Sequence, residues 1–220
     1  MRVKTDARRQ AILDAALALF RDVGFERASM AQISALVGGS KATLYSYFPS
    51  KEALFAAAMI EAMEEQGQAM LDLLDPSEPD ISKVLLRFGE AFLAFVTEPE
   101  HMACVRTAIA QGGNSELGAS LYRLGTRRGW TAISAYIGTI MTRGDLIPSD
   151  PHMAAMHLKG MLEAGIIYPM LFGAEPELDG KSAVTGAVVA FLRAYGWRQA
   201  DGAVLATSES GAAGRGNLDE

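Results

Sequence analysis

The sequence has almost no cysteine, since Cys104 is the only one among 220 residues. This scarcity excludes a disulfide framework and a cysteine-based metal site, and it fits a reducing cytosol. Long apolar runs are also missing. Residues 160–174 form the most apolar later segment, but Glu163 and Pro169 interrupt it, and a membrane-spanning helix needs about 20 apolar residues. The first ten residues carry charges and lack the apolar region of a secretory signal. We therefore expect a soluble, cytoplasmic protein with no membrane partner.

Histidine is scarce as well, with three residues in the chain. His152 and His157 are five positions apart, about 140° around a helix, so they do not share one face. Glu98 and His101 form a single Glu-x-x-His motif, whereas a di-iron bundle needs two. We interpret these histidines as surface or capping residues and expect no metal and no cofactor. No motif such as G-x-S-x-G marks a nucleophile with its base, so we expect no enzymatic activity.

The charges are unevenly distributed along the chain. The net charge is −6, yet residues 1–51 hold eight Lys/Arg against four Asp/Glu, which leaves −10 for the remainder. A basic N-terminal part on an acidic body is what a protein needs if one end meets a polyanion such as DNA. A chance fluctuation of a few charges is the alternative.

Helical periodicity runs through the chain, and no segment shows the sustained period-2 alternation of a strand. Between Asp6 and Val23 the apolar residues recur at helical spacing, and Gly24 is expected to end this helix. Two short helices are expected over 31–37 and 40–47, and Ser29, Ser40 and Ser50 are expected to cap the second, third and fourth helices. The longer helical patterns cover about 51–74, 82–97, 99–111, 115–143, 150–172 and 181–195. The fold class is therefore all-α, followed by an Ala/Gly/Ser-rich tail at 199–220 that we expect to be flexible.

The segment GGSKATLYSYFPSKEALF, residues 38–55, combines a glycine pair with hydroxyls and lysines. It does not have the G-x-x-x-x-G-K-[ST] spacing of a phosphate-binding loop. Together with the expected helix over 31–37, it supplies the turn and the second short helix of a helix-turn-helix unit, about residues 31–50, which would present its second helix to the DNA major groove. Leu44 and Phe48 would face inward, leaving polar side chains outside that suit phosphates and base edges. An ordinary helical hairpin with solvated polar residues is the alternative.

Several motifs in this region occur in a specific order. The run from Ile33 to Phe48, the SKEALF segment after it and the helix that ends in Gly24-Phe25 before it together resemble the DNA-binding domain of the TetR family of bacterial transcription regulators. The resemblance covers about residues 8–68. Ser34 stands where alanine is common, and Gly39 where valine usually packs into the turn. Both are small, so we expect a slightly looser turn and an intact fold.

The resemblance implies specific DNA contacts. It assigns Ser29 and Tyr47 to phosphates, Lys51 to a further phosphate anchor, and Ser40, Lys41, Thr43 and Tyr45 to the recognition helix. The choice between base and phosphate for the recognition-helix residues stays open, because it depends on docking and on DNA shape. For Arg2, Lys4 and Arg8, an N-terminal arm that contacts DNA and a mobile solubilising arm are both open.

The resemblance also implies a dimer on a palindromic operator, with a C-terminal domain over residues 69–198 that dimerises and holds a small-molecule inducer. The surroundings of residues 127–130 and 143–146 resemble the AefR-like subgroup of these domains. Small residues at helical spacing predict the dimer seam, with intramolecular packing as the alternative. These residues are Gly160, Ala164, Ala183, Gly186, Ala187, Ala190 and Ala194.

Methionine and aromatic side chains line adaptable apolar cavities, although they also fill ordinary cores. The residues predicted to line the inducer pocket are Phe88, Phe92, Phe95, Met102, Trp130, Tyr168 and Met170. They favour an apolar or aromatic inducer. The sequence as a whole therefore predicts a dimeric repressor released from its operator by such a ligand. A ligand-binding or interaction protein of the same fold that binds no operator is the main alternative, and an enzyme in the C-terminal cavity is a second.

Overall fold

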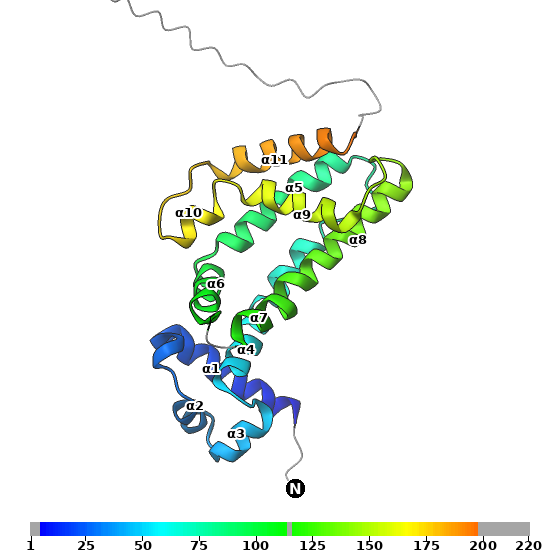
Figure 1. The fold of residues 1–220 in the computed structure, drawn as a ribbon. Coiled ribbons are helices and arrows are strands. Elements are labelled where there is room, and N and C mark those ends of the chain that lie inside the picture. The colour runs from blue at the N-terminus through cyan, green and yellow to red at the C-terminus, as the bar shows by residue number, and fades with distance from the viewer. Residues whose placement is uncertain (1–4, 114–115, 198–220) are drawn as a thin grey trace, which may run out of the picture.

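A computed structural model describes residues 5–113 and 116–197 (Figure 1). This part of the chain is all-helical, which confirms the predicted fold class. The predicted tail at 199–220, together with Arg2 and Lys4, lies outside the described residues. The helices are α1 (Asp6–Arg27), α2 (Met30–Val37), α3 (Lys41–Tyr47), α4 (Lys51–Leu71), α5 (Ile81–Thr97), α6 (Pro99–Gln111), α7 (Leu117–Leu121), α8 (Arg127–Arg143), α9 (Pro151–Glu163), α10 (Ile167–Leu171) and α11 (Gly180–Ala194).

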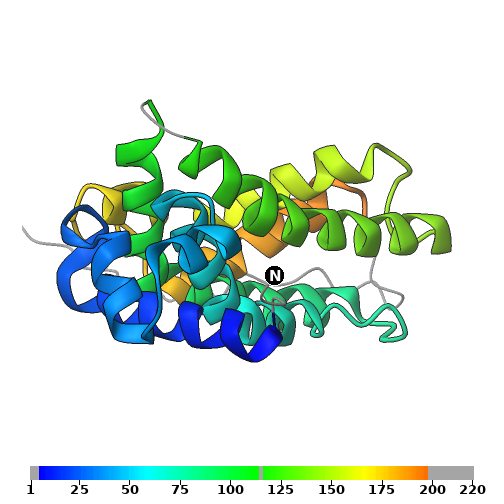
Figure 2. The same cartoon turned by 90° about the horizontal axis from the view of Figure 1, so that it is seen from below.

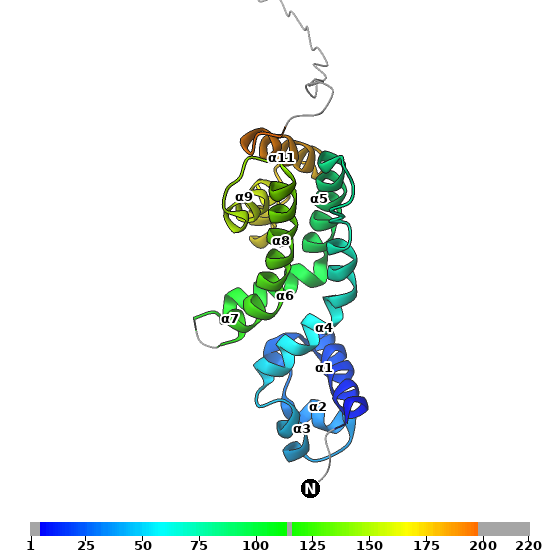
Figure 3. The same ribbon diagram turned by 90° about the vertical axis from the view of Figure 1, so that its right-hand side faces the viewer.

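The molecule is elongated, with α1, α2 and α3 at one end and α11 at the other (Figures 1 and 3). The long helix α4 runs from the end that holds α1 to α3 toward the end that holds α11. Helices α6 and α7 lie where α1 to α3 meet the rest of the molecule. Viewed from the α2–α3 end in Figure 2, α1 to α3 lie in front of the remaining helices. The helix-turn-helix unit is therefore presented at an extremity of the molecule.

Local side-chain caps begin the first four helices, because the first N–H groups of a helix have no partner within it. The side chains of Thr5, Ser29, Ser40 and Ser50 each accept a hydrogen bond from a backbone N–H three residues later. The predicted caps at the three serines are confirmed. These caps set where α2, α3 and α4 begin.

Three predicted helices differ from the observed ones. Gly24 breaks the helical backbone with φ +77° as expected, but after this kink the helix continues to Arg27. The pattern over 150–172 forms two helices, since the chain leaves helical geometry at Ala164 and Gly165 has φ +72°. The pattern over 115–143 contains a π-helical segment, Tyr122–Thr126, between α7 and α8. The two later interruptions were not predicted, because apolar residues at helical spacing lie on both sides of each.

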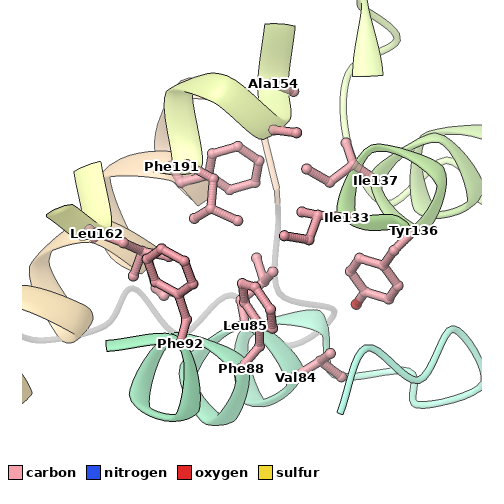
Figure 4. Close-up of a cluster of buried hydrophobic side chains, with 14 of the residues drawn as sticks. Val84, Leu85, Phe88, Phe92, Ile133, Tyr136, Ile137, Ala154, Leu162 and Phe191 are labelled. Carbon is pink, nitrogen blue, oxygen red and sulfur yellow. The ribbon is translucent and has the colours of Figure 1, made fainter. Parts of the chain in front are cut away.

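Two apolar cores stabilise the chain. The first, which we call the head core, joins α1 to α3 with the beginning of α4 and contains the aromatic cluster Phe20, Phe25 and Phe55. The second, the body core, joins α5, α8, α9 and α11 (Figure 4). Burial of this apolar surface is the main driving force for both. The predicted domain boundary at residue 68 falls inside α4, whose Met59 belongs to the head core and Met70 to the body core.

The head, by which we mean α1 to α3 and the beginning of α4, also packs against α6 and α7. Cys104 and Leu117 are buried members of the head core. Arg21 of α1 makes a bidentate ion pair with Glu100 of α6, with N to O distances of 2.6 and 2.7 Å. At the other end of α6, Gln111 donates to the carboxylate of Glu26. Helix α6 is thus fastened to α1 near both of its ends.

No helix within residues 5–113 and 116–197 is long and apolar enough to cross a membrane.

Candidate functional site

The helix-turn-helix unit exposes one polar face of α3. Leu44 of α3 and Phe48, just beyond its end, are buried against Ile33 of α2 and the rest of the head core. On the other side Lys41 is exposed and Tyr45 is 49% exposed. This alternation fixes which side chains of α3 can meet a partner. It also agrees with the predicted inward positions of Leu44 and Phe48.

The hydroxyls at the start of α3 form a small network. The Oγ of Ser40 accepts from the backbone N of Thr43 at 3.1 Å and lies 3.0 Å from the Oγ1 of Thr43. Thr43 is half-buried. The Ser40 side chain is therefore held in place by the helix that it caps, and it holds the Thr43 hydroxyl in turn.

Ser29 and Tyr47, predicted near phosphates, lie at the beginning of α2 and the end of α3. Ser29 caps α2 and donates to the Oε1 of Gln32 at 2.7 Å. The hydroxyl of Tyr47 accepts from the backbone N of Thr5 at 3.0 Å. Both side chains therefore have partners within the head, in addition to any contact that they make with DNA.

Lys51 has a role that its sequence position did not reveal. Its ammonium donates to the carbonyl of Phe25 at 2.8 Å and lies 4.2 Å from the centre of the Phe25 ring. A cation at the carbonyl end of a helix is stabilised by the partial negative charge there. Lys51 thus joins the start of α4 to the end of α1, and its contact with phosphate stays a prediction.

The segment that contains the helix-turn-helix unit carries charges of one sign. Between Glu26 and Glu52 the chain holds no Asp or Glu but contains Arg27, Lys41 and Lys51. A phosphate backbone approaching α2 and α3 would therefore meet no carboxylate from this segment, and repulsion would be small. This charge pattern suits a polyanion better than an acidic or neutral partner.

The turn between α2 and α3 is more constrained than the sequence suggested. We expected Ser34 and Gly39 to loosen it. Instead, the buried Oγ of Ser34 donates to the carbonyl of Gly39 at 3.1 Å. The two positions that depart from the usual family pattern are therefore bonded to each other across the turn.

A cavity of about 550 Å³ lies between α4, α5, α6, the π-helical segment, α8 and α9. Its size falls within the range of roughly 300–1,000 Å³ that is usual for small-molecule sites. Four of the seven residues predicted for the pocket line it, namely Phe92, Phe95, Met102 and Trp130. Because these side chains come from three different helices, the fold brings them together although the sequence separates them.

The other three predicted pocket residues lie elsewhere. Phe88 is fully buried in the body core, where it packs with Phe92 and points among residues of α8 and α11 (Figure 4). Tyr168 is 71% exposed on α10. Met170 lines a separate hollow between α5 and α11. Helical spacing cannot separate a core aromatic from a cavity aromatic, because both faces are apolar.

Sequence reasoning missed several lining residues. Met59 and Met63 of α4 face the cavity, and so does His101, which we had interpreted as a surface or capping residue. The imidazole of His101 packs edge-on against Phe95 with 4.8 Å between ring centres, and its Nδ1 is buried without a hydrogen-bond partner among the described residues. Burial lowers the pKa of His101 and so favours the neutral form of the ring.

The charges at the cavity are internally balanced. Lys159 pairs with Glu163, and Arg128 of α8 pairs with Glu64 of α4 at 3.0 Å. Cys104 also lines the cavity, and burial raises the pKa of its thiol to about 12. The thiol therefore stays protonated and unreactive at neutral pH. The arrangement suits an uncharged, largely apolar small molecule.

The predicted dimer stripe divides into two faces. Ala183 and Ala187 of α11 are 5% exposed and belong to the body core, which is the intramolecular alternative. The other five, Gly160, Ala164, Gly186, Ala190 and Ala194, are exposed.

Within the described chain, no group of three or more His, Cys, Asp or Glu side chains is arranged to hold a metal ion.

Comparison with known proteins assigns both parts of the chain. Residues 12–58 match the family model described as bacterial regulatory proteins, tetR family, and residues 83–197 match the C-terminal domain of the AefR-like transcriptional repressors. The HTH-type transcriptional regulator RutR of Escherichia coli (strain K12) is 45% identical over 58 residues, which are 26% of this chain and 27% of RutR. The chain thus spans about a quarter of the length of this curated relative.

Two solved structures extend the likeness to both domains. A TetR-family transcriptional regulator from Mesorhizobium loti is 24% identical with a TM-score of 0.76, and the alignment covers 88% of this chain and 99% of that one. This likeness shows the fold. The flavonoid-responsive regulator FrrA is 25% identical with a TM-score of 0.68, over 86% of this chain and 97% of FrrA.

Proposed function

Because this chain belongs to the TetR family of bacterial regulatory proteins, with an AefR-like C-terminal domain, we propose that it is a homodimeric repressor. It would bind a palindromic operator in double-stranded DNA through α3 and leave it when a small ligand occupies the cavity. The observation that carries this proposal is the exposed face of α3 within an acid-free segment at one end of the molecule. The function requires no catalysis and no cofactor.

The experiment that tests the DNA-binding function is selection of bound fragments from a library of random duplexes and from the DNA around its own gene. Two recognition helices related by a twofold axis should enrich a palindrome whose half-sites are about one helical turn apart, roughly 34–36 Å. If no palindrome is enriched even at low salt, the helical ligand-binding protein without an operator becomes the better interpretation.

The release mechanism follows from the position of the cavity. Its wall includes α4, which begins at Lys51 directly after the recognition helix, and α6, which is bonded to α1 through Arg21 and Glu26. A ligand that binds one arrangement of these helices better than the other shifts the population by its differential affinity. We propose that the ligand-bound arrangement separates the two recognition helices by the wrong distance for the operator.

The ligand that we propose is uncharged and mainly apolar or aromatic. The aromatic and methionine lining supports this class, and the paired charges at the wall leave no net charge to neutralise. The name of FrrA as a flavonoid-responsive regulator agrees with a flat aromatic ligand. If saturating cognate ligand left operator affinity unchanged, the release mechanism would be wrong and DNA binding would still stand.

Replacing Gly67 by leucine should abolish the ligand response and preserve DNA binding. Gly67 lies on α4 at the cavity wall, and a Cβ there would be 3.8 Å from the ring of Phe95. A leucine would therefore occupy the cavity, while its helix propensity exceeds that of glycine by roughly 1 kcal/mol. The measurement is ligand-induced release from the selected duplex. Gln66→Leu, exposed on the same helix, is the control and should respond as the wild type does.

The exposed small residues of α9 and α11 support the proposed dimer seam. Close approach of two helices requires such residues, so Ala190→Glu should place an unpaired carboxylate in the seam and shift the protein from dimer to monomer. Sedimentation equilibrium measures the mass directly. Ala132→Glu, on an exposed position of α8, adds the same charge and should remain dimeric. If the Ala190→Glu protein stayed dimeric, the dimer interface would have to lie elsewhere on the molecule.

A further inference from the structure

The end of α2 is held by side chains from outside the turn. The last carbonyls of a helix have no partner within it, and three successive carbonyls here accept bonds from side chains. Arg8 donates through Nη1 to Val37 at 3.2 Å and through Nη2 to Gly38, while Ser34 donates to Gly39 at 3.1 Å. Arg8 lies 29 positions before Val37, so the contact joins the first turn of α1 to the turn that precedes α3.

Gly39 leaves the space that the Arg8 guanidinium fills. A Cβ built on Gly39 would lie 2.7 Å from the Nη2 of Arg8, and the only other atom within 4 Å would be the Cζ of the same side chain. The backbone of Gly39 also has φ +139°, a value that residues other than glycine rarely adopt. The backbone therefore favours glycine at this position, and a Cβ there would displace the Arg8 guanidinium from its place beside the turn.

The same turn of α1 contacts the other end of α3. The backbone N of Thr5 donates to the hydroxyl of Tyr47 at 3.0 Å, and the Oγ1 of Thr5 accepts from the backbone N of Arg8 at 3.2 Å. The beginning of α1 therefore contacts both ends of α3. Arg8 contacts the turn before the first residue of α3, and Thr5 contacts its last residue, Tyr47. Such contacts restrain both ends of a seven-residue helix that would be marginal alone.

We propose that Arg8, Ser34 and Gly39 form a lock that orients α3 for sequence readout. Arg8 is then a positioning residue and not a contact of an N-terminal arm with DNA, because its guanidinium is committed to the carbonyls of Val37 and Gly38. The inference rests on the proposed DNA-binding function. It assigns part of the specificity of the protein to a residue that touches no base.

The test compares Arg8→Ala with Arg9→Ala in the full-length protein. Both variants lose one positive charge at neighbouring positions, but Arg9 pairs with Glu61 of α4 and lies 5.8 Å from the centre of the Phe48 ring, at the end of α3 away from the turn. The probes are the duplex selected by the wild type and a scrambled duplex of equal length, each titrated over a range of salt concentrations. Hydrogen exchange of the amides of residues 41–48 is measured in parallel.

A lock predicts a selective effect. Losing hydrogen bonds from a charged donor should lower the affinity of Arg8→Ala for the selected duplex by about tenfold or more. Its affinity for the scrambled duplex and its salt slope should match those of Arg9→Ala, and only Arg8→Ala should accelerate exchange in α3. An equal loss on both duplexes with a shallower salt slope would instead make Arg8 a phosphate contact. Unchanged exchange in α3 would also overturn the lock.

A second set of variants keeps the proposal testable if Arg8→Ala folds poorly. Gly39→Ala should weaken binding less in an Arg8→Lys background, whose smaller head group vacates the space beside the new Cβ. Gly38→Ala is the control, since Gly38 shares a positive φ of +71° but has no atom within 4 Å of a built Cβ. Equal effects of Gly39→Ala in both backgrounds contradict the lock. If the wild type selects no sequence, the DNA-binding function fails, while the exchange measurements still decide whether the lock exists.

Discussion

Replacing Phe55 by alanine is expected to lower the free energy of unfolding of the head by about 3–5 kcal/mol, the usual cost of truncating a buried phenylalanine. Phe55 is 4% exposed and packs edge-on against Phe20 and Phe25, with ring centres 4.9 and 5.0 Å apart. Its removal takes away apolar contacts of two other rings and leaves a cavity that the surrounding helices fill only in part. DNA binding should be lost with the head, because Leu44 and Phe48 belong to the same core.

Urea unfolding followed by circular dichroism measures this effect, together with binding to the selected duplex. The control is Phe172→Ala, because Phe172 is 75% exposed just after α10 and is not part of the head core. It should change the free energy of unfolding by less than about 0.5 kcal/mol. A Phe55→Ala protein with near wild-type stability would show that the aromatic cluster is not the main support of the head.

Replacing Lys41 or Thr43 by alanine is expected to change which operator sequence the protein prefers. Both lie in the first turn of α3, and the N-terminal residues of a recognition helix are those that reach base edges. A good side-chain contact with a base contributes about 1–3 kcal/mol of discrimination against the wrong base. Loss of one should therefore reduce the ratio of specific to non-specific affinity by roughly 5- to 150-fold.

The measurement is repeated selection from the random library with each variant, followed by titration of the wild-type and variant consensus duplexes. Ser46→Ala serves as the control, since Ser46 is exposed on α3 and its hydroxyl donates to the carbonyl of Thr43. Unchanged preference in both the Lys41 and the Thr43 variant would remove these residues from the readout set. A uniform loss on every duplex would instead assign them to phosphates.

The head shows which features can be read from a sequence. Its serine caps, the glycine turn and the inward positions of Leu44 and Phe48 depend on residues within a few positions of one another, so local pattern was enough to predict them. The role of Lys51 was not predictable in this way. Its partner, the carbonyl of Phe25, is 26 positions earlier in the chain, and only the packing of α1 against α4 brings them together.

In the body core, too, local sequence pattern predicted the buried helices but not which residues the packing brings together. The apolar stripes of α5, α8, α9 and α11 predicted buried helices, but they did not distinguish Phe88 of the core from Phe92 at the cavity wall, four residues away. His101 was interpreted as a surface or capping residue because a single Glu-x-x-His motif does not make a metal site, and nothing in its neighbourhood along the chain indicated a cavity wall. A cavity is a gap left where several helices fail to fill the space between them, so no single segment of the sequence encodes it.

The amino-acid sequence by itself determined most of the helices, the acid-free face of α3 and the family to which the chain belongs, because each depends on the short-range order of residue types. The tertiary structure alone showed which side chains line the cavity, the buried imidazole of His101 and the contact of Arg8 with the turn before α3. These features depend on distances between residues far apart in the chain, and those distances exist only once the two cores have packed.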